Sequence, residues 1–394
     1  MDNKTKRLYF IDAMRAWAIL MMLQGHFVDG LLEMEFRDGS NPFYAVWAYF
    51  RGMTAPIFFT VSGFIFTYLL VRGEKKGINN PRVKKGIKRG LELLFIGYLL
   101  RMNLFGLLQG EIYDSFYLVD VLHCIGLSIL GLIGIYLMAQ KRGKAFFPLA
   151  LLVMTIGLFL FEPIYKTWSF AALPDAFANY LTKSNGSIFT IFPWFGYAAF
   201  GGFLSLLFTR FKNFKYLYPT AIALSLVGGL GLIFGSSDLF LELSRATGIQ
   251  LFADIFFNNY LFIRLGDVLL AFAVFMLFRA WMHNSAVLKI GQSTLSIYVV
   301  HFMILYGSIT GLGLYRFLQH SLSPALAIFG ALAFMVLCTY IALQYEKHKV
   351  AIKLSLATAG KYALVQSEVI AVNGLEFIKD QFYKLLRRIG LVKN

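Results

Sequence analysis

Three ionisable side chains near the N-terminus could carry chemistry: Asp12, Arg15 and His26. They lie in an apolar run near residues 9–31, which is long enough to cross a bilayer as a helix. The separation from Arg15 to His26 corresponds to ~16 Å of helix and about three turns, so both face roughly one side. Arg15 could hold phosphate at the cytoplasmic mouth, and His26 could titrate near mid-membrane. Alternatively, Arg15 reaches lipid phosphate and His26 only bonds a neighbouring helix.

A second set of ionisable residues falls in later apolar runs. Asp120 and His123 lie one turn apart in the fourth apolar run, Arg101 lies in the third, and His301 lies in the ninth. Such groups cost several kcal/mol at bilayer depth unless paired or hydrated, so each is a functional candidate. Asp120 could fix the tautomer of an imidazole, as carboxylates do for catalytic bases. Hydrogen bonds that merely bridge helices explain these residues equally well, and Arg101 must meet either a partner elsewhere or an anionic ligand.

Metal and nucleophile motifs are absent from the sequence. The histidines lack the i, i+4 spacing of a helical zinc pair, and neither Cys124 nor Cys338 joins them in a ligand pattern, so we expect no metal. The chain has no P-loop, no GxGxxG after a strand and no GxSxG. Ser62, in FFTVSGF, stands beside a glycine, which favours close helix packing over a nucleophilic role.

The elements that must position these residues are membrane helices. The chain is 58% hydrophobic and 15% charged, against roughly 45–50% and 25% in soluble domains. This composition predicts an all-α, polytopic helix bundle, residues 1–346, followed by a basic amphipathic cytoplasmic tail, residues 347–394. Ten crossings are predicted near residues 9–31, 53–71, 88–108, 116–138, 145–163, 188–209, 216–235, 258–280, 290–312 and 322–344.

The charge pattern predicts the orientation of these crossings. Most of the 37 Lys and Arg residues fall in alternate connections, which indicates an even number of crossings with both termini in the cytoplasm. Topology selection and the membrane surface therefore explain the net charge of +16, and no nucleic acid is expected. The N-terminal sequence favours a retained first span over a cleaved signal. Apolar and basic residues at helical spacing predict that the tail lies on anionic lipids.

Several motifs resemble those of a known superfamily. RLYFIDAMRAWAILMMLQGHF carries an arginine, ten residues and a histidine, the signature of the first helix of acyltransferase-3 proteins. PIFFTVSGFIFTYLL resembles the second-helix motif of the transmembrane acyltransferase superfamily. Further motifs, in order along the chain, look more like relatives of heparan-alpha-glucosaminide N-acetyltransferase: KRGLELLFIGYLLR, DVLHCIGLSIL, FPWFGYAAFGGFLS and KIGQSTLSIYVVHFMIL.

The resemblance implies an acyltransferase of the bacterial inner membrane. It would move an acyl group, usually acetyl in such families, from cytoplasmic acetyl-CoA or another acyl-CoA to a sugar, polysaccharide or glycolipid on the outer side. We expect His26 to act as the base, oriented by Asp120 or another acid, with Arg101 or His301 polarising the thioester carbonyl. His123 belongs to the same candidate catalytic set.

The residues expected to hold the coenzyme A donor gather near the cytoplasmic entrance, where cations suit phosphates. They are Asp12, Arg15, Ser62, Lys85, Lys88 and Arg89. A covalent acetyl-histidine relay is an alternative to direct transfer. The main rival function is a transporter or flippase for a small anionic or lipid-linked substrate, in which the same buried charges line a substrate or proton path.

Overall fold

The computed structural model describes residues 8–73 and 75–388, and these residues form helices and contain no strand. The longer helices are α1 Tyr9–Leu31, α2 Pro42–Val71, α3 Pro81–Arg101, α5 Val121–Ala139, α6 Phe146–Leu160, α9 Ile191–Arg210, α10 Leu217–Leu230, α11 Ser236–Thr247, α13 Tyr260–Leu277, α15 Thr294–Tyr306 and α17 Pro324–Arg388. Shorter helices are α4 Leu104–Leu108, α7 Glu162–Tyr165, α8 Asp175–Ala178, α12 Gln250–Phe257, α14 Ser285–Gln292 and α16 Leu314–Leu318. The predicted all-α, polytopic class is confirmed.

The apolar helices are those of a multi-pass membrane protein. Six helical segments of the described chain are long and apolar enough to cross a bilayer, and the count reaches seven if the bent pair α14 and α15 forms one span. Each of the ten predicted crossings coincides with a helix or helix pair. However, α1 and α3 carry polar and charged residues and α6 has only 15 residues. The number ten therefore stays a prediction.

Two helices begin earlier than the hydropathy predicts, because each has an asparagine cap followed by proline. The Asn41 side chain accepts from the Phe43 amide at 3.0 Å, so α2 begins at Pro42 and not at residue 53. The Asn80 side chain accepts from the Arg82 amide at 2.9 Å, so α3 begins at Pro81. Proline suits the first helical position because its missing N–H would be unpaired there.

Another boundary differs near residues 236–257, which hydropathy predicts as an external connection. A short π-helical stretch, Gly231–Gly235, continues α10 into α11, and the helical run ends at Thr247. Asp238, Glu242 and Arg245 are polar, which lowers the hydropathy there, but they do not break a helix.

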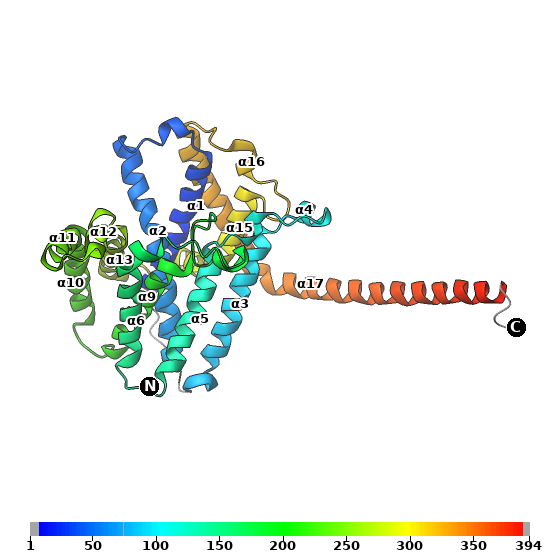
Figure 1. Cartoon of the computed structure of the whole chain (residues 1–394), viewed down its shortest axis with the longest axis horizontal. Helices are drawn as coiled ribbons and strands as arrows, with labels where there is room; N and C mark the ends of the chain where they lie inside the picture. The colour runs from blue at the N-terminus through cyan, green and yellow to red at the C-terminus, as the bar shows by residue number, and fades with distance from the viewer. Residues whose placement is uncertain (1–7, 74, 389–394) are drawn as a thin grey trace. The chain divides into compact units, whose positions relative to one another are not determined.

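Within residues 1–341 the helices alternate in direction (Figure 1). We call the first end the one at which α1 begins, α2 ends and α3 begins, and the second end the one at which α1 ends and α2 begins. Arg101 at the end of α3, Asp120 before α5 and the segment 161–190 after α6 belong to the second end. The predicted cytoplasmic connections belong to the first end.

Glycines allow the helix axes of the bundle to approach closely. A Cβ at Gly63 of α2 would overlap the carbonyl of Ala198, and one at Gly201 of α9 would overlap the carbonyl of Thr60. Reciprocal glycine contacts of this kind also join α3 to α5 and α10 to α13. Small residues at helix interfaces serve membrane bundles because van der Waals contact, not hydrophobic transfer, holds the helices together.

This packing gives a testable expectation at Gly63. Gly63→Ala must push α2 away from α9. We expect it to lower the free energy of unfolding by at least about 1–3 kcal/mol, the usual cost of overpacking. Gly134→Ala is the matched control, because a Cβ on that residue of α5 meets no atom within 4 Å. Helix propensity favours alanine there by up to about 1 kcal/mol. Thermal unfolding in detergent measures both, and equal midpoints for the two variants would contradict the packing account.

Residues 342–394 form a separate compact unit, most of which is the later part of α17. Helix α17 continues through Arg388, and Lys347 and His348, near the start of this unit, are exposed. Most of the apolar and basic side chains on which the amphipathic prediction depends lie outside the described side chains. The domain division at residue 346 and the lipid-surface role of the tail stay predictions.

Candidate active site

His26 and His301 form a hydrogen-bonded pair between α1 and α15. The Nδ1 atom of His26 lies 3.1 Å from the Nε2 atom of His301, whose own Nδ1 contacts the carbonyl oxygen of Tyr298. A carbonyl only accepts, so Nδ1 of His301 carries a proton. In the neutral pair, Nε2 of His301 is then the acceptor and Nδ1 of His26 the donor. This order leaves the lone pair on Nε2 of His26, which is the arrangement of a general base.

The His26 ring lines a cavity of about 230 Å³ formed by α1, α2, the start of α5 and residues 188–194. Two further polar groups of its lining are buried and have no hydrogen-bond partner within the described residues: Oγ1 of Thr54 and Nε1 of Trp194. Unpaired buried donors cost about 1–3 kcal/mol, so they indicate a place where a polar ligand group completes the bonding.

Arg51 of α2 brings a cation to the same cavity. Its guanidinium forms an ion pair with Asp29, which also accepts from Arg37 at 3.1 Å. Gly25, next to His26, allows this approach, because a Cβ there would lie 3.2 Å from Cγ of Arg51. Two cations share one carboxylate, so a net positive charge remains beside the base.

Asp120, His123 and Arg101 form a second polar cluster at the second end. The Oδ1 atom of Asp120 lies 3.0 Å from Nδ1 of His123 and accepts from the Leu122 amide at 3.0 Å, which caps α5. Its Oδ2 lies 3.4 Å from Nε of Arg101, which supplies the partner that the sequence did not reveal. Asp120 thus orients His123, whereas the partner of His26 is His301.

The His123 ring is fully buried, and its fit depends on a glycine. A Cβ at Gly97 of α3 would lie 2.5 Å from the ring, and the Tyr98 ring packs edge-on at 4.4 Å. The Nε2 atom of His123 has no hydrogen-bond partner among the described residues. The Tyr98 and Tyr180 hydroxyls are hydrogen-bonded at 2.7 Å nearby. Val121, next to Asp120, lines the His26 cavity, so the two clusters are neighbours.

The residues predicted to bind the acyl-CoA donor, near the first end, are only partly brought together. Arg15 donates to Oγ1 of Thr294 at 3.0 Å and lies 3.9 Å from Asp12. Gly291 lets α14 touch the backbone of Asp12, which brings the start of α15 beside Arg15. Both Arg15 and His26 therefore contact α15, the first through Thr294 and the second through His301.

The remaining residues predicted to bind acyl-CoA lie on α2 and α3. Lys85 and Lys88 are exposed near the start of α3, and Arg89 pairs with Glu92 at 3.0 Å on the surface. Ser62 is half-buried beside Gly63, at the close contact between α2 and α9. Among residues 8–73 and 75–388, no three His, Cys, Asp or Glu residues are grouped as a metal site would need.

The family described as heparan-alpha-glucosaminide N-acetyltransferase, catalytic, matches residues 7–241, more than half of the chain. The chain belongs to this family. No curated protein matches it. Membership of this acetyltransferase family confirms the resemblance found in the motifs, and the match contains His26, Arg51, Asp120 and Trp194 but ends before His301.

Sequence reasoning missed three members of the His26 cavity of this acetyltransferase-family protein: Arg51, Thr54 and Trp194. The Asn41–Pro42 cap was an available signal for Arg51, because it places Arg51 and Thr54 inside α2 rather than at its edge. Trp194 resembles any interfacial tryptophan in sequence, and only its unpaired Nε1 distinguishes it.

Proposed function

We propose that this protein transfers an acetyl group from acetyl-CoA, which approaches from the cytoplasmic side, to a hydroxyl or amine of a sugar or glycolipid acceptor on the opposite side. The acceptor side is the second end of the bundle. The observation that carries the proposal is the polarised pair of His26 and His301, because it leaves Nε2 of His26 basic at a cavity of about 230 Å³.

In the proposed step, the acceptor oxygen or nitrogen attacks the thioester carbonyl carbon while its proton passes to Nε2 of His26. The new C–O or C–N bond forms, the C–S bond breaks, and the sulfur leaves as coenzyme A thiolate, which takes up a proton. In this step His301 acts through its hydrogen bond to His26, so it is a positioning residue. Both of its nitrogens are engaged, which leaves no free N–H for polarising the carbonyl.

The carbonyl oxygen gains negative charge in this step, and the cavity offers partners for it. Arg51 supplies positive charge, and the unpaired Nε1–H of Trp194 and hydroxyl of Thr54 supply donors. Donors fixed in place before reaction stabilise a developing oxyanion without reorganisation. The positive charge of Arg15, Lys85 and Lys88 toward the first end suits the phosphates of coenzyme A.

Removing either unpaired donor gives a graded expectation. Thr54→Val keeps the shape of the cavity and Trp194→Phe keeps an aromatic ring there, but each loses one hydrogen bond, and we expect kcat to fall by about tenfold. The Thr54 hydroxyl has no partner among the described residues, so we expect Thr54→Val to leave stability unchanged, whereas Trp194→Phe also loses part of the packing against Phe59 and Phe189. Steady-state kinetics and thermal unfolding test the two statements, and an unchanged kcat in both variants would contradict the assigned role.

The proposed function itself is tested by thiol release from acetyl-CoA in purified full-length protein reconstituted in nanodiscs. Glucosamine and glucose supply amine and hydroxyl acceptors, and mass spectrometry identifies any acetylated product. We expect acceptor-dependent thiol release with matching product. Arg15→Gln should raise KM for acetyl-CoA, whereas kcat should change little. Absence of both thiol release and product for all acceptors would contradict the proposal.

A further inference from the structure

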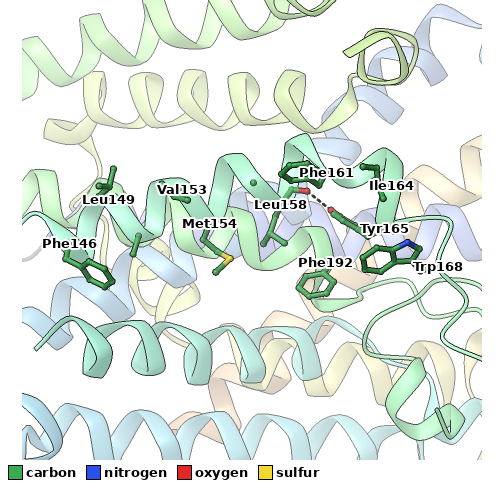
Figure 2. Close-up of a pocket in the computed structure, with 12 residues that line it drawn as sticks. Phe146, Leu149, Val153, Met154, Leu158, Phe161, Ile164, Tyr165, Trp168 and Phe192 are labelled. Atoms are coloured by element: carbon green, nitrogen blue, oxygen red, sulfur yellow. Dashed lines mark hydrogen bonds between the residues drawn. The ribbon is translucent and has the colours of Figure 1, made fainter. Parts of the chain in front are cut away.

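An apolar groove of about 800 Å³ runs along α6 and α7. Figure 2 shows its lining side chains spread along the helix from Phe146 at one end to Trp168 at the other, with Phe192 facing them. The volume lies within the ~300–1,000 Å³ of small-molecule sites, but all of the lining residues are apolar or aromatic. The groove therefore suits a hydrocarbon chain.

This groove and the His26 cavity lie on either side of one short segment. Phe192 lines the groove, whereas Ile188, Phe189 and Trp194 line the His26 cavity. The two sites therefore lie close to each other along residues 188–194. This proximity distinguishes the groove from the general lipid-facing surface of the bundle.

Positive charge flanks the groove at its second end. The Nζ atom of Lys166 lies 3.4 Å from Oε2 of Glu162. Glu162 directly follows Phe161 and Lys166 directly follows Tyr165, and both of these aromatic residues line the groove. Lys183, whose side chain is exposed, also interacts electrostatically with Glu162. Two cations thus lie near one carboxylate at the end of the groove that Trp168 lines. The excess charge suits a phosphate.

We propose that the groove binds the single hydrocarbon chain of a lipid-linked acceptor, whose phosphate lies at Lys166 and Lys183 and whose sugar reaches the His26 cavity. This inference rests on the proposed function and assigns its acceptor class. The apolar lining selects the chain, the lysines select the anionic junction, and the shared segment 188–194 aligns the sugar with the base.

Photolabelling tests the binding part with the full-length protein in nanodiscs. The probes are dodecyl phosphate and dodecanol, each with a terminal diazirine. Gly157→Leu fills the groove, and Gly134→Leu is the matched control, since a Cβ at either glycine meets no atom within 4 Å. We expect the phosphate probe to label residues 146–168, about tenfold less in Gly157→Leu, and unchanged in Gly134→Leu. Lys166→Ala with Lys183→Ala should reduce labelling by the phosphate probe alone.

Equal labelling of Gly157→Leu and the unsubstituted protein, or uniform labelling of all lipid-facing helices by both probes, would overturn the inference, because ordinary bilayer lipid would then explain the groove. Kinetics tests the acceptor part with dodecyl-phospho-glucosamine and free glucosamine. We expect KM to be about tenfold lower for the lipid-linked acceptor, and Gly157→Leu to abolish that difference while kcat on glucosamine is retained.

The outcomes separate the two proposals. Acetylation of glucosamine without preference for the chain-bearing acceptor would overturn the lipid-linked acceptor and leave the proposed function standing. Acetylation of neither acceptor, with labelling confined to residues 146–168, would overturn the proposed function and the acceptor role together, and would retain the groove only as a lipid site.

Discussion

His26→Gln is expected to lower kcat/KM for acetyl transfer by about 10²–10⁴-fold, the contribution of a positioned general base. Glutamine can still donate to Nε2 of His301, so the contact between α1 and α15 is kept. It cannot take a proton from the acceptor. We therefore expect acetyl-CoA affinity, measured by equilibrium binding, to stay within roughly twofold, because the base acts on the acceptor.

His348→Gln is the matched control for this substitution, because His348 is exposed on α17 and belongs to the other compact unit. It should leave kcat/KM unchanged. The kcat/KM of His301→Leu should lie between those of His26→Gln and His348→Gln, since this substitution leaves the His26 ring in place but removes its hydrogen-bond partner. A His26→Gln enzyme as active as the His348→Gln enzyme would refute the role of His26.

Asp120→Ala is expected to cost about 3–5 kcal/mol of stability. The substitution leaves the mostly buried guanidinium of Arg101 without its carboxylate, and removing one partner of a poorly hydrated ion pair is the expensive way to break it. It also removes the cap of α5 and the partner of Nδ1 of His123. Chemical or thermal unfolding in detergent measures the loss.

Glu242→Ala supplies the comparison, because Glu242 also pairs with an arginine, Arg245, but both side chains are exposed. Exposed pairs contribute about 0–1 kcal/mol. Arg101→Met combined with Asp120→Ala should recover part of the loss, since the uncompensated charge is removed. If Asp120→Ala and Glu242→Ala were equally stable, the Arg101–Asp120 pair would not be holding α3 against α5.

The class of fold and one contact between polar side chains could be predicted from sequence. Apolar runs and the alternation of Lys and Arg indicate the polytopic bundle, because both patterns are local properties of the chain. The Asp120–His123 contact also follows from local spacing, since residues three apart share a helix face. The motifs from KRGLELLFIGYLLR onward indicated the heparan-alpha-glucosaminide N-acetyltransferase relatives, and the family match confirms that resemblance.

The arrangement of the cavity could not be predicted, because it depends on distant parts of the chain. His26 and His301 are 275 residues apart, and their pairing depends on how α15 packs beside α1. The partner of Arg101 likewise follows from the close approach of α3 and α5. Hydropathy alone also placed the start of α2 at residue 53, which put Arg51 outside the membrane helix that carries it.

The most direct test of the central claim follows the acetyl group itself. Purified protein in nanodiscs is incubated with [¹³C₂]acetyl-CoA and glucosamine, and mass spectrometry measures labelled N-acetylglucosamine. We predict labelled product from the unsubstituted protein and from His348→Gln, and about 10²–10⁴-fold slower formation in His26→Gln. Labelled product formed at equal rates by His26→Gln and the unsubstituted protein would contradict the account.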